Sequence, residues 1–232
     1  MSSILKASQI TKEFANQEKI LKGISLEIHS GSFTVMLGPS GSGKTTLLNI
    51  LSGLAQPTSG KVYFGDTPIT HFSDTQLADW KRDHTGNIFQ NYLLLNNLTV
   101  LENITIGISP HTTPIPLEKL TRLLEIDSLL DKFPAQLSGG QQQRVAIARA
   151  VIKKPDLLFC DEATGALDES NSKIVVALLQ TLKNIFGLTI LFVTHNLQIA
   201  ETADRVITIK DGLLHQDHLN PNPISAYDMV WE

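Results

Sequence analysis

The sequence has little of several features, and each shortage excludes a class of protein. It holds a single cysteine, Cys160, so no internal disulfide can form, and the apolar run around this residue predicts a buried thiol. No apolar run approaches the roughly 18 residues that a membrane-spanning helix needs. The N-terminal residues lack the apolar core of a signal peptide. We therefore expect a cytosolic chain, unless another component holds it at a membrane.

Basic charge is scarce as well. The chain has 19 Lys and Arg residues against 23 Asp and Glu residues, which gives a formal net charge of −4. A general nucleic-acid-binding protein normally carries a basic face, so nucleic acid is not an expected partner and any attraction for phosphate must be local. The sequence also has no internal repeat and no heptad run of the kind that predicts a long coiled coil.

What the sequence does contain is an alternation of strand and helix patterns along 232 residues, a length that suits one large α/β domain. Strands are predicted at residues 24–28, 33–37, 156–161, 188–193 and 205–210, with a hairpin at 61–69. Helices are predicted at residues 45–51, from 99, from 117, at 142–153 and at 174–185. Residues 91–144 are mostly helical and look like an insertion, whereas the tail from residue 217 is polar and is not predicted to fold.

The strand at residues 33–37 leads directly into a glycine-rich loop and then a predicted helix. The loop follows the P-loop pattern, in which bare backbone N–H groups curl around phosphates. Lys44 is expected to reach the terminal phosphates, and the Thr45 hydroxyl to ligate Mg²⁺. The sequence thus predicts a nucleotide site in this phosphate loop (residues 38–46), formed by Gly38, Ser40, Gly41, Ser42, Gly43, Lys44, Thr45 and Thr46.

Two adjacent acids, Asp161 and Glu162, end the apolar run that includes Cys160. Such a pair is usually a helix cap or a surface pair. In a chain with a phosphate loop, however, Asp161 suits the metal shell of a nucleotide hydrolase, and Glu162 suits a general base that polarises water. Neighbouring carboxylates repel each other, and a bound Mg²⁺ would relieve that repulsion.

Three other polar residues have no assigned role when taken alone. Gln90 follows a strand-like segment, where a glutamine is unremarkable. His195 follows the strand at residues 188–193, where a histidine is more often a structural hydrogen bonder. Asp168 would ordinarily be the N-cap of a helix.

Leu137-Ser138-Gly139-Gly140-Gln141 is a second phosphate-seeking segment. Its two glycines leave the backbone bare, and the helix that follows presents unpaired N–H groups and a partial positive charge. With one nucleotide expected and two such segments, the sequence leaves open whether they meet within one molecule or between two.

Taken in order along nearly the whole chain, these motifs resemble the ATP-binding subunit of ABC transporters. Many nucleotide hydrolases share the P-loop, but the segment at residues 137–141 resembles the signature sequence that defines this family. The resemblance implies an α/β fold: a P-loop NTPase core with a mostly parallel sheet flanked by helices. It also implies an N-terminal antiparallel β subdomain and an inserted helical subdomain at about residues 91–144, all within a single domain at 1–232 with a polar tail at 217–232.

The same resemblance implies roles for individual residues. Phe14 would stack on adenine, and Gln90 would sense Mg²⁺ and the membrane partner. Glu162 would be the catalytic base, and His195 would contact the γ-phosphate. Asp168 would be the D-loop aspartate. Two copies would sandwich two ATP molecules, each held by the phosphate loop of one chain and by the signature segment of the other, namely Ser138, Gly139, Gly140 and Gln141.

Transport by such a chain requires separate integral membrane permease subunits, which would place it at the cytoplasmic face of the cell membrane. The helical insertion just after Gln90, including residues 92–95, is the expected docking surface, although the leucines of that segment could equally be core residues. Residues 137–150 and 160–168 look most like the group with macrolide exporters, lipoprotein-release ATPases, cell-division ATPases and peptide-antibiotic resistance transporters, although Ala163 replaces a frequent proline. We therefore expect an ATP hydrolase of export or resistance type.

Two alternatives remain. The first is an ABC ATPase without transport, acting in cell division or as an assembly scaffold. The second is a DNA-repair or chromosome-organising ATPase, which the absence of a heptad run disfavours.

Overall fold

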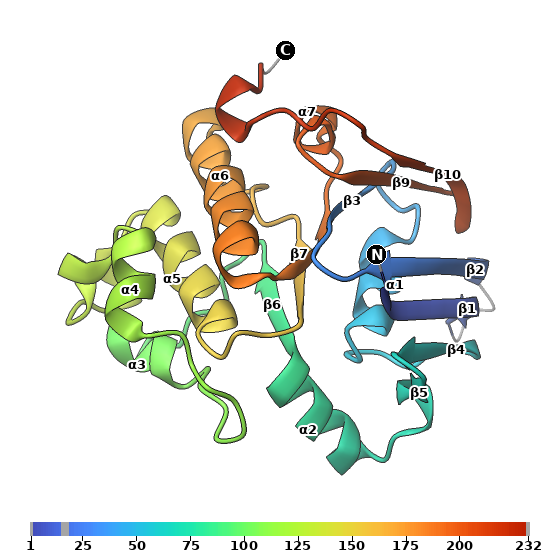
Figure 1. Ribbon diagram of the computed structural model, residues 1–232, viewed down its shortest axis with the longest axis horizontal. Helices are drawn as coiled ribbons and strands as arrows, with labels where there is room; N and C mark the ends of the chain where they lie inside the picture. The colour runs from blue at the N-terminus through green and yellow to red at the C-terminus, as the bar shows by residue number, and fades with distance from the viewer. Residues whose placement is uncertain (1, 15–18, 231–232) are drawn as a thin grey trace.

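The computed structural model describes residues 2–14 and 19–230, and its centre is a six-stranded sheet (Figure 1). The strand order is β10-β9-β3-β8-β7-β6, and every neighbouring pair is parallel except β10 with β9. The strands are β3 (Phe33–Leu37), β6 (Thr85–Phe89), β7 (Leu157–Asp161), β8 (Thr189–Val193), β9 (Arg205–Lys210) and β10 (Leu213–Leu219). The predicted α/β class with a mostly parallel sheet is confirmed.

A second sheet is antiparallel and has the order β2-β1-β4-β5. Its strands are β1 (Ser3–Glu13), β2 (Lys19–His29), β4 (Ser59–Phe64) and β5 (Thr67–Pro68). Successive side chains of a strand point to opposite faces. On β7, therefore, Phe159 lies in the core shared with the small sheet, and Cys160 lies in the core shared with the helices. Burial raises the pKa of the Cys160 thiol, as expected for an inert buried cysteine.

The helices are α1 (Lys44–Leu51), α2 (Asp74–His84), α3 (Val100–Thr105), α4 (Leu117–Leu123), α5 (Gly139–Val151), α6 (Glu169–Phe186) and α7 (Leu197–Glu201). Helices α3, α4 and α5 gather at one end of the molecule, away from the small sheet (Figure 1). A capping box at Thr99 begins α3, and Gly187 in the left-handed conformation ends α6, as their sequence positions predict.

The structure differs from the sequence expectations in several elements. Strand β1 and helix α2 were not predicted. Helix α5 spans Gly139–Val151 instead of the predicted residues 142–153, and it packs against β6. The hairpin ends early because residue 69 begins a 3₁₀ turn, Ile69–His71.

The tail is also more ordered than its composition suggests. Strand β10 runs on to residue 219, and a 3₁₀ turn, Ala226–Asp228, packs against α6. Ala226 and Met229 are buried in that contact. A local pattern of polar residues and prolines cannot reveal this docking, because it depends on a helix some fifty residues earlier. Residues 231–232 of the tail lie outside the described part of the chain.

Candidate functional site

The phosphate loop joins β3 to α1 and is packed tightly against its neighbours. Gly38 and Gly43 have positive φ angles of 155° and 99°. A Cβ atom on Gly38 would lie 2.1 Å from the carbonyl oxygen of Ile209 on β9, and one on Gly43 would lie 2.8 Å from a methyl group of Leu21 on β2. Only glycine fits these two positions. The loop therefore has a bare backbone where it enters α1, an arrangement suited to phosphate.

The first two residues of α1 connect the loop to the strand end beside it. Lys44 Nζ donates hydrogen bonds to the carbonyl oxygens of Gly38 and Pro39, each at 2.8 Å. The Thr45 hydroxyl donates to a carboxylate oxygen of Asp161 at 3.0 Å.

Burial lowers the pKa of Lys44, although the nearby carboxylates oppose that shift. Burial also raises the pKa of Asp161, and the charge of Glu162 adds to this effect. A cation placed next to Asp161 would therefore be favourable.

Glu162 and His195 meet because β7 and β8 are adjacent parallel strands that end at the same edge of the sheet. Glu162 Oε1 and His195 Nδ1 are 3.1 Å apart, and the imidazole is mostly exposed. The backbone of Glu162 has a φ of +46°, which is uncommon for a residue with a side chain. Its N–H donates to the carbonyl oxygen of Val193 at 3.0 Å. A carboxylate held in this way, partly open to water, can accept a proton.

A cleft of about 260 Å³ brings together part of the predicted site: Phe14, most of the phosphate loop and Glu162. It is lined by Phe14, Ile20, residues 40–46 and Glu162. Phe14 is exposed, and the ammonium group of Lys12 lies 5.6 Å from the centroid of its ring. Gly38 does not line this cleft. The Ser42 hydroxyl is buried and finds no hydrogen-bond partner among residues 2–14 and 19–230.

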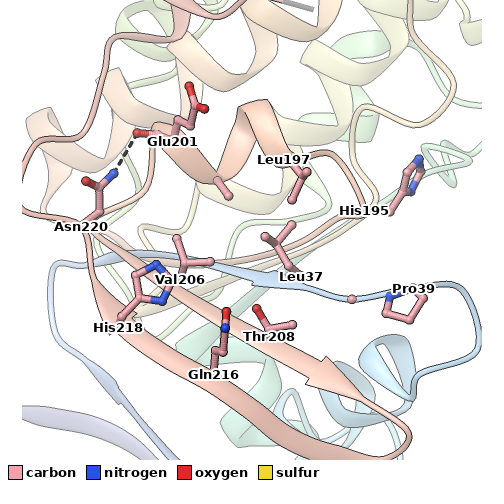
Figure 2. A pocket seen from close by; sticks show the side chains of 12 residues that line it. Leu37, Pro39, His195, Leu197, Glu201, Val206, Thr208, Gln216, His218 and Asn220 are labelled. Carbon is pink, nitrogen blue, oxygen red and sulfur yellow. Dashed lines mark hydrogen bonds between the residues drawn. The ribbon is translucent and has the colours of Figure 1, made fainter. Parts of the chain in front are cut away.

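A larger cavity of about 820 Å³ lies beside the same loop, between α7 and the β9–β10 hairpin. Leu37 and Val206 are among its apolar lining residues, and His195 lies at one edge of the view in Figure 2. The lining also includes Gly38 and Pro39. The cavity therefore lies next to the predicted site. Of the residues in the sequence motifs, only those of the phosphate loop and His195 line it.

Gln90 follows β6, the strand next to β7, and its side chain lies against the turn that Glu162 begins. We call residues 162–165 the Glu162 turn. A Cβ atom on Gly165 would lie 2.8 Å from Gln90 Nε2. Among the described residues, Gln90 makes no hydrogen bond to Thr45 or Asp161.

The signature segment forms the start of α5. The Ser138 hydroxyl accepts a hydrogen bond from the N–H of Gln141 at 3.3 Å, and the Gln141 side chain accepts one from the N–H of Ser138 at 3.0 Å. Gly139 and Gly140 lie in the first turn between them. A Cβ atom on Gly140 would lie 2.7 Å from Asn171 Oδ1.

None of these four signature residues lines the cleft at the phosphate loop. In Figure 1, α1 and α5 lie on opposite sides of β7. The two phosphate-seeking segments therefore do not share one cleft within a single chain.

Asp168 is the N-cap of α6. Its carboxylate accepts a hydrogen bond from the N–H of Asn171 at 2.8 Å and further bonds from the Asn171 side chain. These hydrogen bonds lower the pKa of Asp168. Asn171 thus touches both Asp168 and the signature segment, so these two predicted positions are neighbours.

The sequence reasoning missed two residues that hold this arrangement together, Gln143 and Arg149. Gln143 is buried on α5 and donates to the carbonyl oxygen of Ala163 at 2.6 Å. Arg149 donates to the carbonyl oxygens of Tyr92 and Leu93, which have positive φ angles. A signal for Gln143 was available: it precedes Ile147 by four residues, so helical spacing places it on the apolar face of α5.

Comparison with known proteins agrees with this geometry. The ABC transporter family matches residues 21–165. A putative ABC transporter ATP-binding protein of Mycoplasma pneumoniae is 45% identical over 91% of this chain, but the chain spans only 46% of that relative. The bacitracin export ATP-binding protein BceA of Halalkalibacterium halodurans is 39% identical over 92% of this chain and 87% of its own length.

Among solved structures, the dimeric structure of MJ0796, a bacterial ABC transporter cassette, is 34% identical. It covers 94% of this chain and 99% of its own length, with a TM-score of 0.85. A dimeric post-hydrolysis state of the same cassette, bound to ADP and Pi, has a TM-score of 0.84. The family and fold class inferred from the sequence are thus confirmed. The chain belongs to the ABC transporter family and has the fold of its cassettes.

Proposed function

We propose that this chain is the motor subunit of an exporter, and that it binds MgATP in the cleft at the phosphate loop. Lys44 and the bare N–H groups of the loop would bind the phosphates, and Phe14 would stack on the adenine. The residues present fit Mg²⁺, because Thr45 and Asp161 offer hard oxygen donors only 3.0 Å apart and burial raises the pKa of that carboxyl. Gln90, at the end of the next strand, would be a third ligand.

Few protein ligands are needed for this metal. Within residues 2–14 and 19–230, no three His, Cys, Asp or Glu side chains are grouped to hold a metal ion. Mg²⁺ is usually bound by one or two protein groups together with substrate phosphates and waters. When bound, Mg²⁺ supplies positive charge that neutralises the phosphates.

Hydrolysis would depend on Glu162. Its carboxylate would accept a proton from the attacking water. His195, 3.1 Å from that carboxylate, would help to orient it and would contact the γ-phosphate. Lys44 would stabilise the charge that develops on the phosphoryl oxygens.

One observation carries the proposal of a dimeric motor: the signature segment and the phosphate loop do not share a cleft within one chain. Two copies in head-to-tail arrangement would bring Ser138, Gly139, Gly140 and Gln141 of each copy onto the nucleotide held by the other, with Asp168 near the contact. The dimeric structures of the similar cassette support this arrangement. ATP would then hold two copies together, and hydrolysis would release them.

A separate permease would dock next to Gln90. Leu93 is 55% exposed there, and Ile106 after α3 is 59% exposed. Exposed large apolar side chains of this kind are typical of protein contacts. In the part of the chain that the structure describes, no helix could cross a membrane. Docking on a permease would place the chain at the cytoplasmic face of the membrane.

The resemblance to BceA favours export. The alternative, an ABC ATPase acting in cell division or as an assembly scaffold, keeps the same ATP site. Purification of the chain with its membrane partner separates the two: a partner without a translocation path would favour the alternative.

The decisive experiment mixes two inactive variants. Lys44→Ala disables the phosphate loop, and Ser138→Arg blocks the signature segment. Neither variant should hydrolyse ATP alone. In a mixture, the intact loop of the Ser138→Arg chain would meet the intact signature of the Lys44→Ala chain, so partial ATPase activity should return. A mixture as inactive as its components would refute the shared site.

A further inference from the structure

The buried side chain of Gln143 connects two parts of the site that no sequence motif links. Gln143 lies in the second turn of α5, just after the signature segment, and is fully buried. Its Nε2 donates to the carbonyl oxygen of Ala163, the residue after Glu162, at 2.6 Å. The orientation of the amide is unambiguous, because only its NH₂ group can donate to a carbonyl oxygen.

The Glu162 turn needs external support. Glu162 adopts a φ of +46°, a left-handed backbone conformation that is strained for a residue with a side chain. Two hydrogen bonds hold the backbone of the turn. The Glu162 N–H donates to the Val193 carbonyl oxygen at 3.0 Å, and the Gly165 N–H donates to the Glu162 carbonyl oxygen at 2.8 Å. Among the described residues, Gln143 provides the side-chain hydrogen bond to this backbone. It therefore restrains the turn from the side of α5.

Glutamine is not the side chain that would make the fold most stable at position 143. Gln143 Oε1 is buried and has no hydrogen-bond partner in the described part of the chain. An unsatisfied buried polar atom destabilises the fold, because it has lost its hydrogen bonds to water without gaining others. An apolar side chain of similar length would avoid that cost, although it would leave the Ala163 carbonyl without its donor. The stability of the fold therefore gives little reason for a glutamine at position 143. A need to hold Glu162 in place does give one, because the Gln143 amide bonds the next residue of the turn.

We propose that Gln143 is a positioning residue, which ties the signature helix α5 to the turn that carries Glu162. The inference rests on the proposed dimeric function. In that arrangement the α5 of one copy contacts the nucleotide of the partner site, while Glu162 of the same copy acts on its own nucleotide. Gln143 thus connects the two nucleotide sites through a single hydrogen bond.

The first test uses the homogeneous protein. Gln143→Met keeps the length of the side chain and removes the donor. The matched control is Gln142→Met, because Gln142 is the neighbouring residue and donates to Leu137 instead. We expect Gln143→Met to lower kcat by about tenfold to a hundredfold, as a small misplacement of a reacting group does. KM, the affinity for ATP and Tm should stay close to those of the wild type, and Gln142→Met should change none of these values.

A kcat equal to that of the wild type in folded Gln143→Met would overturn the proposal. So would a loss of kcat that Gln142→Met shares. Should Gln143→Met not fold, Gln143→Leu also removes the donor with an uncharged side chain. If neither variant folds, the amide serves the fold and the proposal is wrong.

The second test separates positioning of Glu162 from a general effect on α5. In the active mixture of Lys44→Ala and Ser138→Arg chains, Glu162 comes from the Ser138→Arg chain and the signature comes from the Lys44→Ala chain. Adding Gln143→Met to the Ser138→Arg chain should reduce activity by the same factor as in the homogeneous variant. Adding it to the Lys44→Ala chain should reduce activity much less.

A loss found mainly in the Lys44→Ala arm would mean that Gln143 acts through the signature on α5, and equal losses in both arms would mean a general effect on the fold; either result would overturn the proposal. An inactive parent mixture would refute the shared site itself. In that case the kcat and KM comparison still decides whether Gln143 positions Glu162.

Discussion

Two glycines of the phosphate loop differ in what an added methyl group would meet, so alanine at each should have different effects. At Gly38, a Cβ atom would lie 2.1 Å from the Ile209 carbonyl oxygen, whereas at Gly41 it would meet nothing within 4 Å. Gly41→Ala therefore bears only the strain of its φ of +77°, which costs about 1–2 kcal/mol.

Gly38→Ala must also displace the backbone of β9, which is paired with both β3 and β10. Overpacking costs about 1–3 kcal/mol and backbone strain a further 1–3, so we expect a loss of about 2–6 kcal/mol.

Urea unfolding of both variants without nucleotide measures these differences directly. For a domain of this size, 1 kcal/mol corresponds to about 2–4 °C in Tm, so thermal unfolding provides a second reading. We expect Gly38→Ala to lose at least about 1 kcal/mol more than Gly41→Ala. If Gly41→Ala is the less stable variant, or if the two variants are equally stable, the reasoning is refuted. The close packing of the loop against β9 would then not add to the cost of Gly38→Ala.

Three further predictions concern other parts of the chain. Glu162→Gln should keep ATP affinity within a few-fold but lower kcat by about 10²–10⁴; wild-type turnover would remove Glu162 from its role. Burial lowers the pKa of Lys153 from 10.5 to about 8. The unfolded chain therefore binds more protons between those pH values, and stability should rise with pH across that window. In Lys153→Met, the free energy of unfolding measured with urea should lack this rise with pH. A pH profile equal to that of the wild type would contradict the role of Lys153. Met229→Ala should cost about 2 kcal/mol, near the low end for a core truncation because the tail can adjust; an unchanged Tm would mean that the tail is not docked in solution.

Short-range signals in the sequence were sufficient for the elements of the core. Continuous apolar runs marked β3, β7 and β8, because strands covered on both faces bury every side chain. Caps at Thr99 and Gly187 marked helix ends, because the unpaired groups of a helix terminus need particular partners or a left-handed residue. The phosphate loop was equally visible from its glycine pattern, and the packing around Gly38 and Gly43 leaves no room for a side chain.

Other features depended on contacts between residues far apart in the chain. The φ of +46° at Glu162 and the bond from Gln143 to Ala163 have no local signature, because a residue on another element determines each. The docked tail was missed for the same reason. Three site candidates could equally have had ordinary structural roles, namely Gln90, Asp168 and His195. Only the family resemblance singled them out.

The sequence by itself determined the fold class, the phosphate loop and the family, because periodicity, glycine positions and motif order are properties of neighbouring residues. The tertiary structure decided that Asp161 meets Thr45, that Glu162 meets His195, and that the signature segment lies away from the cleft. These relations follow from the strand order β3-β8-β7-β6, in which neighbours in the sheet are distant in the chain. Pairing of distant strands is set by the packing of the whole core, and no local pattern encodes it.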